Sequence, residues 1–382
     1  MIGLSDFASF YTAAEILRDG RGYQLYDLNL QETVERSVMP EAVKERGGFL
    51  PFNHPAFEAA VFLPLTVFSF QTAFRIWFSI NIGLLFAVIW VLRKYLPLLG
   101  RAPFYLWAAG CLSFPPIAIT LIQGQDSIVL LFFYCMAFIA LRREAKFSAG
   151  GWIAAELFKF QVSLPFIVPI LLRRRWRIIA GFCFVGTLLV IISLGTVGFA
   201  GVLQYPSYVW RLDHDPTFGW LVPLRTPNLR GLILNSPLSI LPRLCKTLFW
   251  ISSGILVAAG AFVWRTESTP NYRSLYRAFA CNLLISVLLS YHILVHDLSV
   301  LFLALLLVVE NAVDGLHGHG WVRTSTWACA ALLWSPLYFI LMHFDHLDIL
   351  AMVFLILVGA VVIQSPRGKP LGEQATQDPA IS

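Results

Sequence analysis

The sequence is poor in charge. Asp, Glu, Lys and Arg make up only 13% of its 382 residues, whereas soluble globular proteins carry roughly 25%. Hydrophobic residues make up 58% of the chain, and the mean hydropathy is +0.71. So few charges cannot cover the surface of a soluble fold of this size. We therefore predict an all-α polytopic membrane protein and exclude a soluble enzyme.

Cysteine is scarce as well. Five of the six cysteines lie inside apolar runs, which gives neither a disulfide framework nor a cysteine-based metal site. The formal net charge of +6 comes from bases in short clusters between apolar runs. Such clusters are typical of cytoplasmic loops rather than of a nucleic-acid groove. We expect membrane lipids as partners and no nucleic acid.

Long apolar stretches are abundant, and they predict about nine spans. A membrane-crossing helix needs about 20 apolar residues, and some of the stretches are shorter. We expect their polar ends to lie below the membrane surface and to line a cavity. The stretches are Phe62–Leu92, Phe104–Ile122, Ile128–Leu141, Ile178–Gly198, Thr247–Trp264, Ala278–Tyr291, Leu298–Val309, Trp327–Met342 and Leu347–Ile363.

Basic clusters predict the orientation. Clusters around Arg93, Arg142, Arg174 and Arg273 follow the positive-inside rule if all of them are cytoplasmic. Six polar patches then fall on the extracytoplasmic side. We predict one transmembrane catalytic domain over residues 1–364, with extracytoplasmic loops that contain helices at 1–58 and 201–246, and a disordered cytoplasmic tail at 365–382.

One apolar segment does not fit a simple crossing. Trp152–Leu172 has bases at both ends and Lys159-Phe160-Gln161 in its middle. We predict a re-entrant hairpin whose tip, Lys159 to Gln161, points to the extracytoplasmic side. Lys159 is either a snorkelling lysine or a functional cation at membrane depth that needs an anionic partner.

Other polar residues allow two interpretations each. Asp6 precedes an amphipathic helical pattern, so it is either the cap of that helix or a catalytic base. Gln125 and Asp126 either end two helices or bind a ligand. His292 and His296 are four residues apart, a spacing that could ligate a metal on a helix. No third ligand is evident, so these histidines are either a turn of satisfied polar residues or substrate contacts.

The order of these features resembles the C-type membrane glycosyltransferases, specifically glycosyltransferase family 87. These are polyprenyl-phosphate-sugar-dependent enzymes related to bacterial mannosyltransferases. The resemblance extends to about Leu306. The resembling pieces are Asp6-Phe7-x-x-Phe10-Tyr11 with Ala13-Ala14, Leu25-Tyr26-Asp27, Phe62-Leu63-Pro64-Leu65, Gly124-Gln125, Lys159-Phe160-Gln161 before Pro165, and the turn from His292 to Asp297.

The resemblance implies a C-type glycosyltransferase bundle and a function. The enzyme would move a mannose-like hexose from a polyprenyl-phosphate donor to a lipid-linked or glycan acceptor, with inversion, on the extracytoplasmic side of a bacterial inner membrane. Asp6 would be the catalytic base, and no metal or other cofactor is expected. The substrate-binding residues would be Tyr11, Asp27, His54, Gln125, Lys159, Gln161, His292, His296 and Asp297. A transporter or flippase of a lipid-linked saccharide is the alternative, although the chain lacks the internal repeat that transporters often have.

The sequence departs from the family pattern in three places. The family's Tyr-Pro-Pro element reads Asn53-His54-Pro55, and its late Tyr-Asp pair reads His296-Asp297. The family also has a transmembrane helix before the Asp-Phe motif. Translocating the basic segment 1–58 without such a helix runs against the charge bias of first helices. We therefore expect the gene product to begin upstream of Met1 with one further helix.

Overall fold

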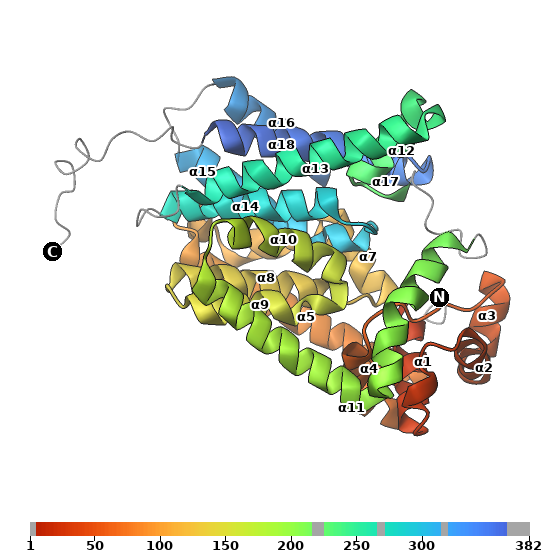
Figure 1. The fold of residues 1–382 in the computed structure, drawn as a ribbon. Helices are drawn as coiled ribbons and strands as arrows, with labels where there is room; N and C mark the ends of the chain where they lie inside the picture. The colour runs from red at the N-terminus through yellow and green to blue at the C-terminus, as the bar shows by residue number, and fades with distance from the viewer. Residues whose placement is uncertain (1–4, 216–224, 266–271, 315–319, 365–382) are drawn as a thin grey trace.

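The computed structural model describes residues 5–215, 225–265, 272–314 and 320–364, and all regular elements in these ranges are helical (Figure 1). The predicted all-α membrane fold is thus confirmed, while the predicted disordered tail lies outside the described residues. The α-helices are α1 (Phe7–Arg18), α2 (Leu28–Val38), α3 (Pro40–Arg46), α4 (Ala56–Phe62), α5 (Phe70–Tyr95), α6 (Phe104–Leu112), α7 (Pro115–Gln123), α8 (Ser127–Arg142), α9 (Lys146–Ala155), α10 (Phe160–Leu172), α11 (Trp176–His214), α12 (Leu229–Leu234), α13 (Pro242–Arg265), α14 (Tyr272–Leu289), α15 (Leu301–Asp314), α16 (Gly320–Trp334), α17 (Leu337–His343) and α18 (Leu350–Ile363).

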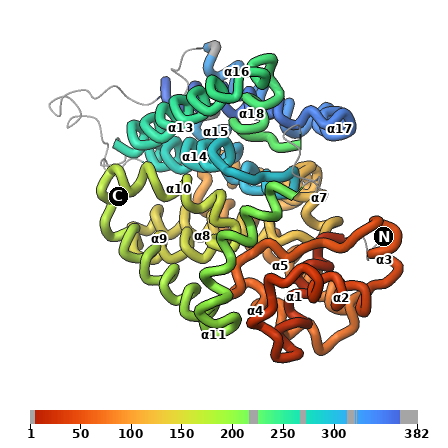
Figure 2. Tube along the Cα trace, turned by 45° about the vertical axis from the view of Figure 1, so that its right-hand side comes forward, coloured from red at the N-terminus to blue at the C-terminus, as the bar shows by residue number. Residues whose placement is uncertain are grey.

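The helices enclose two hydrophobic clusters. The larger one joins most of α5 to helices α6–α10 and α13–α18. The smaller one joins α1–α4, the start of α5 and the second half of α11 around the ring of Phe7, which contacts Phe62, Phe70, Phe74 and Trp77. Figure 2 shows the N-terminal helices and the C-terminal helices on opposite sides of α8–α10. The N-terminal segment therefore packs as a folded cap on the bundle.

Fewer helices are full spans than the sequence predicts. Within the described residues, α5, α11 and α13 are long and apolar enough to cross a membrane, and there are up to six spans if each bent helix pair counts as one. The apolar stretches in α8, α15 and α18 form helices of only 16, 14 and 14 residues, which is short of the roughly 20 that a bilayer needs. The described residues thus contain three to six candidate spans, where the sequence predicts about nine, and one of the bent pairs in this count is α9 with α10.

Helix α11 bends where its predicted span ends. Gly198 has φ 73° and ψ 175° inside the helix, a conformation that residues with a Cβ rarely adopt. After this kink the chain stays helical to His214. The region 201–246, predicted as a long loop, therefore contains the end of α11, all of α12 and the start of α13 in its described parts.

The predicted hairpin is present. The segment breaks after α9, passes through a 3₁₀ turn at Leu157–Lys159 and returns as α10. A Cβ on Gly150 would lie 1.8 Å from the carbonyl oxygen of Ile178, so α9 packs directly on the start of α11. Because α11 begins four residues after α10 ends, the start of α9 lies beside the end of α10. Lys159 occupies the tip, as the flanking bases predict.

The basic clusters gather at the other end of the bundle. The guanidinium of Arg142 lies 5.3 Å from the ring centre of Tyr272, and Arg143 donates a hydrogen bond of 2.5 Å to the hydroxyl of Tyr95. Helix α8 has 16 residues, so it separates these bases from Asp126 at its start by about 24 Å. The predicted separation of bases from polar patches therefore holds within the molecule.

Candidate active site

The polar patches meet in one cavity of about 540 Å³. Eight of the ten residues that the resemblance placed in the site line it. The eight come from segments spread over most of the chain: Asp6, His54, Gln125, Lys159, Gln161, His292, His296 and Asp297. The polar turns that the sequence predicts on one face thus line a shared cavity.

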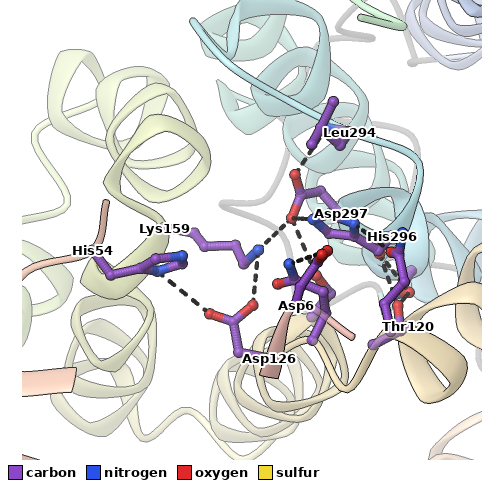
Figure 3. A network of polar contacts seen from close by, with 12 residues as sticks. Asp6, His54, Thr120, Asp126, Lys159, Leu294, His296 and Asp297 are labelled. Atoms are coloured by element: carbon purple, nitrogen blue, oxygen red, sulfur yellow. Dashed lines mark hydrogen bonds and ion pairs between the residues drawn. The ribbon is translucent and has the colours of Figure 1, made fainter. Parts of the chain in front are cut away.

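Lys159 is held between two carboxylates (Figure 3). Its side chain is 3% exposed, and its ammonium lies 2.8 Å from Asp126 Oδ1 and 2.5 Å from Asp297 Oδ1. A buried ammonium needs such partners, because transfer of an unpaired charge into a low-dielectric interior is very costly. Lys159 therefore joins the hairpin tip to the start of α8 and to the turn after α14.

The turn at His296 and Asp297 is built from hydrogen bonds to α7 and α8. Asp297 Oδ1 also accepts a hydrogen bond of 3.1 Å from Ser127, and its Oδ2 accepts one of 2.9 Å from the backbone N–H of Leu294. His296 Nδ1 lies 2.9 Å from Gln123 Oε1. Its Nε2 lies 3.6 Å from Asp297 Oδ1, so each ring nitrogen faces an oxygen.

Asp6 sits in a different environment. It precedes α1, but its side chain makes no capping hydrogen bond. Instead, the amide of Gln125 donates a hydrogen bond of 2.8 Å to Asp6 Oδ2. The capping interpretation of this side chain is therefore wrong. The carboxylate is aimed into the cavity by a neutral group, while Asp126 and Asp297 are offset by a cation.

Two of the histidines that line the cavity, His292 and His54, have different surroundings. Burial is the main reason that the pKa of His292 falls from 6.5 to about 4, so this imidazole is neutral at physiological pH. His54 Nδ1 lies 2.6 Å from Glu58 Oε2 and 3.7 Å from Asp126 Oδ2. His54 therefore belongs to a cluster of ionisable groups, which continues through Asp126 to Lys159.

His54, Glu58 and Asp126 are also the residues that could hold a metal. Their ligand atoms lie within 4.8 Å of one another, and a histidine with two carboxylates is a suitable donor set for several divalent ions. The contact between His54 and Glu58 and that between Asp126 and Lys159 already pair these atoms. The side chains that could ligate a metal therefore already have partners within the protein.

Two predicted site residues lie elsewhere. The hydroxyl of Tyr11 donates a hydrogen bond of 2.7 Å to the carbonyl of Phe68, and its side chain packs in the smaller hydrophobic cluster. Asp27 is exposed and caps α2 through hydrogen bonds from the N–H groups of Asn29 and Leu30. Both residues stabilise the N-terminal segment, and neither lines the cavity.

The structure adds Glu58 to the polar residues that the sequence singled out. Glu58 lies four residues after His54, on the same side of the start of α4, and this spacing is the signal that could have found it. Asp213, Tyr291 and Arg225 complete the rim. Arg225 pairs with Asp345 at 2.8 Å, which joins segments 120 residues apart. No local sequence pattern indicates that pair.

An apolar groove of about 510 Å³ adjoins the cavity. It lies between α10 and α11 and shares Phe160, Gln161, Val209 and Tyr291 with the polar cavity. Its remaining lining is Leu164, Pro165, Tyr205, Pro206, Trp210 and Leu289. Leu164 is 44% and Trp210 61% exposed, so the groove opens on the outer surface of the bundle.

The fold and the cavity define a helical membrane protein in which buried ionisable groups from distant segments converge beside an apolar groove. The sequence model of glycosyltransferase family 87 matches residues 52–291. This is more than half of the chain, which therefore belongs to glycosyltransferase family 87 and is a membrane glycosyltransferase. Asp6 precedes the matched range, and the turn from His292 to Asp297 follows it directly. No curated protein and no solved structure matches the chain.

Proposed function

We propose that this enzyme transfers a mannose-like hexose from a polyprenyl-phosphate donor to a lipid-linked or glycan acceptor, with inversion and without a metal. The observation that carries the proposal is the placement of Asp6. Its carboxylate is aimed into a polar cavity by the amide of Gln125, and that cavity is continuous with an apolar groove. A base and a lipid-compatible groove are what such a reaction needs.

Asp6 supplies the base. Its Oδ2 is held by Gln125, which leaves Oδ1 to take the proton from the acceptor hydroxyl. As that proton moves, the acceptor oxygen attacks the anomeric carbon of the sugar from the face opposite the phosphate. The bond between the anomeric carbon and the phosphate oxygen breaks, and its electron pair leaves with polyprenyl phosphate. One displacement inverts the anomeric centre.

Polar groups on the other walls bind the substrates. Lys159 contributes positive charge for the leaving phosphate, although Asp126 and Asp297 offset much of it. The neutral imidazoles of His292 and His296, together with Gln161, offer donors and acceptors to sugar hydroxyl groups. Asp297 positions Lys159 and the turn that carries both histidines.

The groove supports a lipid donor. Phe160 and Tyr291 line both the groove and the polar cavity. A ligand with an apolar chain and a charged head can therefore place the chain between α10 and α11 and the head near Lys159. Burial of apolar surface stabilises such a chain by about 0.8 kcal/mol per methylene group.

The charge distribution supports an active site on the extracytoplasmic side of a bacterial inner membrane. Exposed Arg143 and Arg174 lie at the end of the bundle away from the cavity. Clusters of Lys and Arg favour the cytoplasmic side. The cavity then faces outwards, where lipid-linked sugars are the available donors.

The proposal is tested by incubating the purified full chain in lipid with labelled polyprenyl-phosphate sugars and candidate acceptors. We expect release of polyprenyl phosphate and a new glycosidic bond with inverted anomeric configuration. Retention of configuration would contradict the single displacement. Movement of the intact donor across a vesicle membrane without cleavage would instead indicate a flippase.

A further inference from the structure

The cavity has a shortage of positive charge. The carboxylates of Asp126 and Asp297 both contact the single ammonium of Lys159. Asp6 adds a third carboxylate to the same cavity. Arg225 also lines the cavity, but it is paired with Asp345. An anionic phosphate that enters this site therefore meets more negative than positive charge, so its binding needs another cation.

His54 is placed to be that cation. It lines the cavity, and its side chain is 12% exposed. The contact of its Nδ1 with Glu58 at 2.6 Å fixes one ring nitrogen. The imidazole also packs against the rings of Phe10 and Phe52, whose centres lie 5.1 Å and 5.6 Å away. Nε2 is then the ring nitrogen available to a ligand in the cavity.

Side chains outside the cavity hold the segment that carries His54. Residues 49–54 form no helix or strand, so their backbone groups need other partners. Tyr26 donates to the carbonyl of His54 at 3.2 Å, and Tyr205 donates to that of Asn53 at 3.1 Å. Gln31 accepts from the N–H of Phe52 at 2.8 Å. This pinning preorganises His54, as a binding residue requires.

The charged neighbours of His54 favour its protonated form. Burial alone lowers the pKa of His54, but Glu58 and Asp126 outweigh burial and the nearby Lys159, so the pKa is raised above 6.5. Burial raises the pKa of the Glu58 carboxyl to about 8, so Glu58 and His54 titrate as a pair. The imidazole is therefore doubly protonated at mildly acidic pH and loses the Nε2 proton as the pH rises through this raised pKa.

We propose that doubly protonated His54, oriented by Glu58, donates a hydrogen bond from Nε2–H to the phosphate of the lipid donor. This inference rests on the proposed function and adds a proton-dependent donor site to it. His54 contacts the substrate, while Glu58 is a positioning residue that acts through His54. The family resemblance does not supply this role, because Asn53-His54-Pro55 stands where the family pattern reads Tyr-Pro-Pro.

The test is the affinity of the full chain in lipid nanodiscs for a polyprenyl methyl phosphate, measured from about pH 5.5 to about pH 8.5. This probe is a phosphodiester, so it lacks the second phosphate ionisation near pH 6 that would confuse the profile. We expect wild-type affinity to fall roughly tenfold as the pH rises, because a charge-assisted hydrogen bond is lost. Polyprenol, which has no phosphate, should bind equally well throughout.

Three variants locate the effect. His54→Gln should bind the probe roughly tenfold more weakly than wild type at low pH and show no pH dependence. Glu58→Gln should keep full affinity at the lowest pH but lose it at a lower pH than wild type, because the carboxylate that favours the imidazolium is gone. His343→Gln, an exposed histidine outside the cavity, should match wild type.

Two outcomes would overturn the inference. The first is a pH profile of phosphodiester affinity for His54→Gln that matches the wild-type profile. The second is an equal pH dependence of polyprenol and phosphodiester binding in the wild type. The second outcome can be measured even if the variant fails to fold. If the wild type transfers sugar but its affinity for the phosphodiester does not change with pH, the role of His54 is wrong and the proposed function still stands. If phosphodiester binding depends on His54 but no sugar is transferred, the role of His54 stands and the proposed function is wrong.

Discussion

The two ends of the helical bundle handle charge in opposite ways. At the cavity end, Lys159, Asp126 and Asp297 are nearly inaccessible to solvent and come from three distant segments. At the other end, bases lie on the surface and stack on nearby rings, as Lys94 does on Trp90 at 5.2 Å. Buried charges therefore depend on the whole fold for their partners, whereas exposed charges contact side chains close to them in the sequence.

Labelling should separate the two ends in an all-or-none way. In a variant without the exposed Cys183, we expect His214→Cys at the cavity end to react with a membrane-impermeant maleimide on intact cells. Arg174→Cys at the basic end should react only after the cells are broken, because the positive-inside rule places it in the cytoplasm. Labelling of position 174 but not of 214 on intact cells would reverse the orientation.

The buried network should be far more sensitive to the loss of a charge than the surface. Lys159→Met leaves Asp126 and Asp297 without their cation, and we expect a loss of roughly 3–5 kcal/mol in the free energy of unfolding. The surface control, Lys94→Met, should change stability by less than about 0.5 kcal/mol. Denaturant unfolding in detergent measures both. Equal stability of the two variants would mean that Lys159 is not the partner that these carboxylates need.

The hairpin that carries Lys159 gives a smaller effect. A Cβ at Gly150 meets the backbone of Ile178 at 1.8 Å, whereas nothing lies within 4 Å of one at Gly83 in α5. We expect Gly150→Ala to destabilise the protein by about 1–3 kcal/mol, and Gly83→Ala to be neutral or stabilising by up to about 1 kcal/mol. Thermal unfolding compares them. A neutral Gly150→Ala would contradict the close packing of α9 on α11.

The sequence predicts features whose signal is local. The flanking bases predict the hairpin with Lys159 at its tip, and the end of an apolar run at Gly198 coincides with the kink in α11. Composition does not show where an apolar stretch stops being helical, so it does not predict that α8 and α18 have only 16 and 14 residues.

The site also combines features that the sequence predicts with features that it does not. The family resemblance leads to eight of the cavity residues, including Asp6, but it also suggests Tyr11 and Asp27, which stabilise the N-terminal segment instead. The pairing of Lys159 with Asp126 and Asp297 depends on contacts across 33 and 138 positions of the chain. Such pairings follow from packing of the helices and leave no periodic pattern in the sequence.

The most direct test of the central claim compares Asp6→Asn with wild type for both sugar transfer and donor binding. The substitution keeps the shape of the side chain and removes the base. We expect release of polyprenyl phosphate to fall by a factor of roughly 10² to 10⁴, while the affinity for the polyprenyl-phosphate sugar stays within about twofold of wild type, since binding does not use the proton acceptor. Transfer by Asp6→Asn at a rate near that of wild type would contradict the account and remove Asp6 from the mechanism.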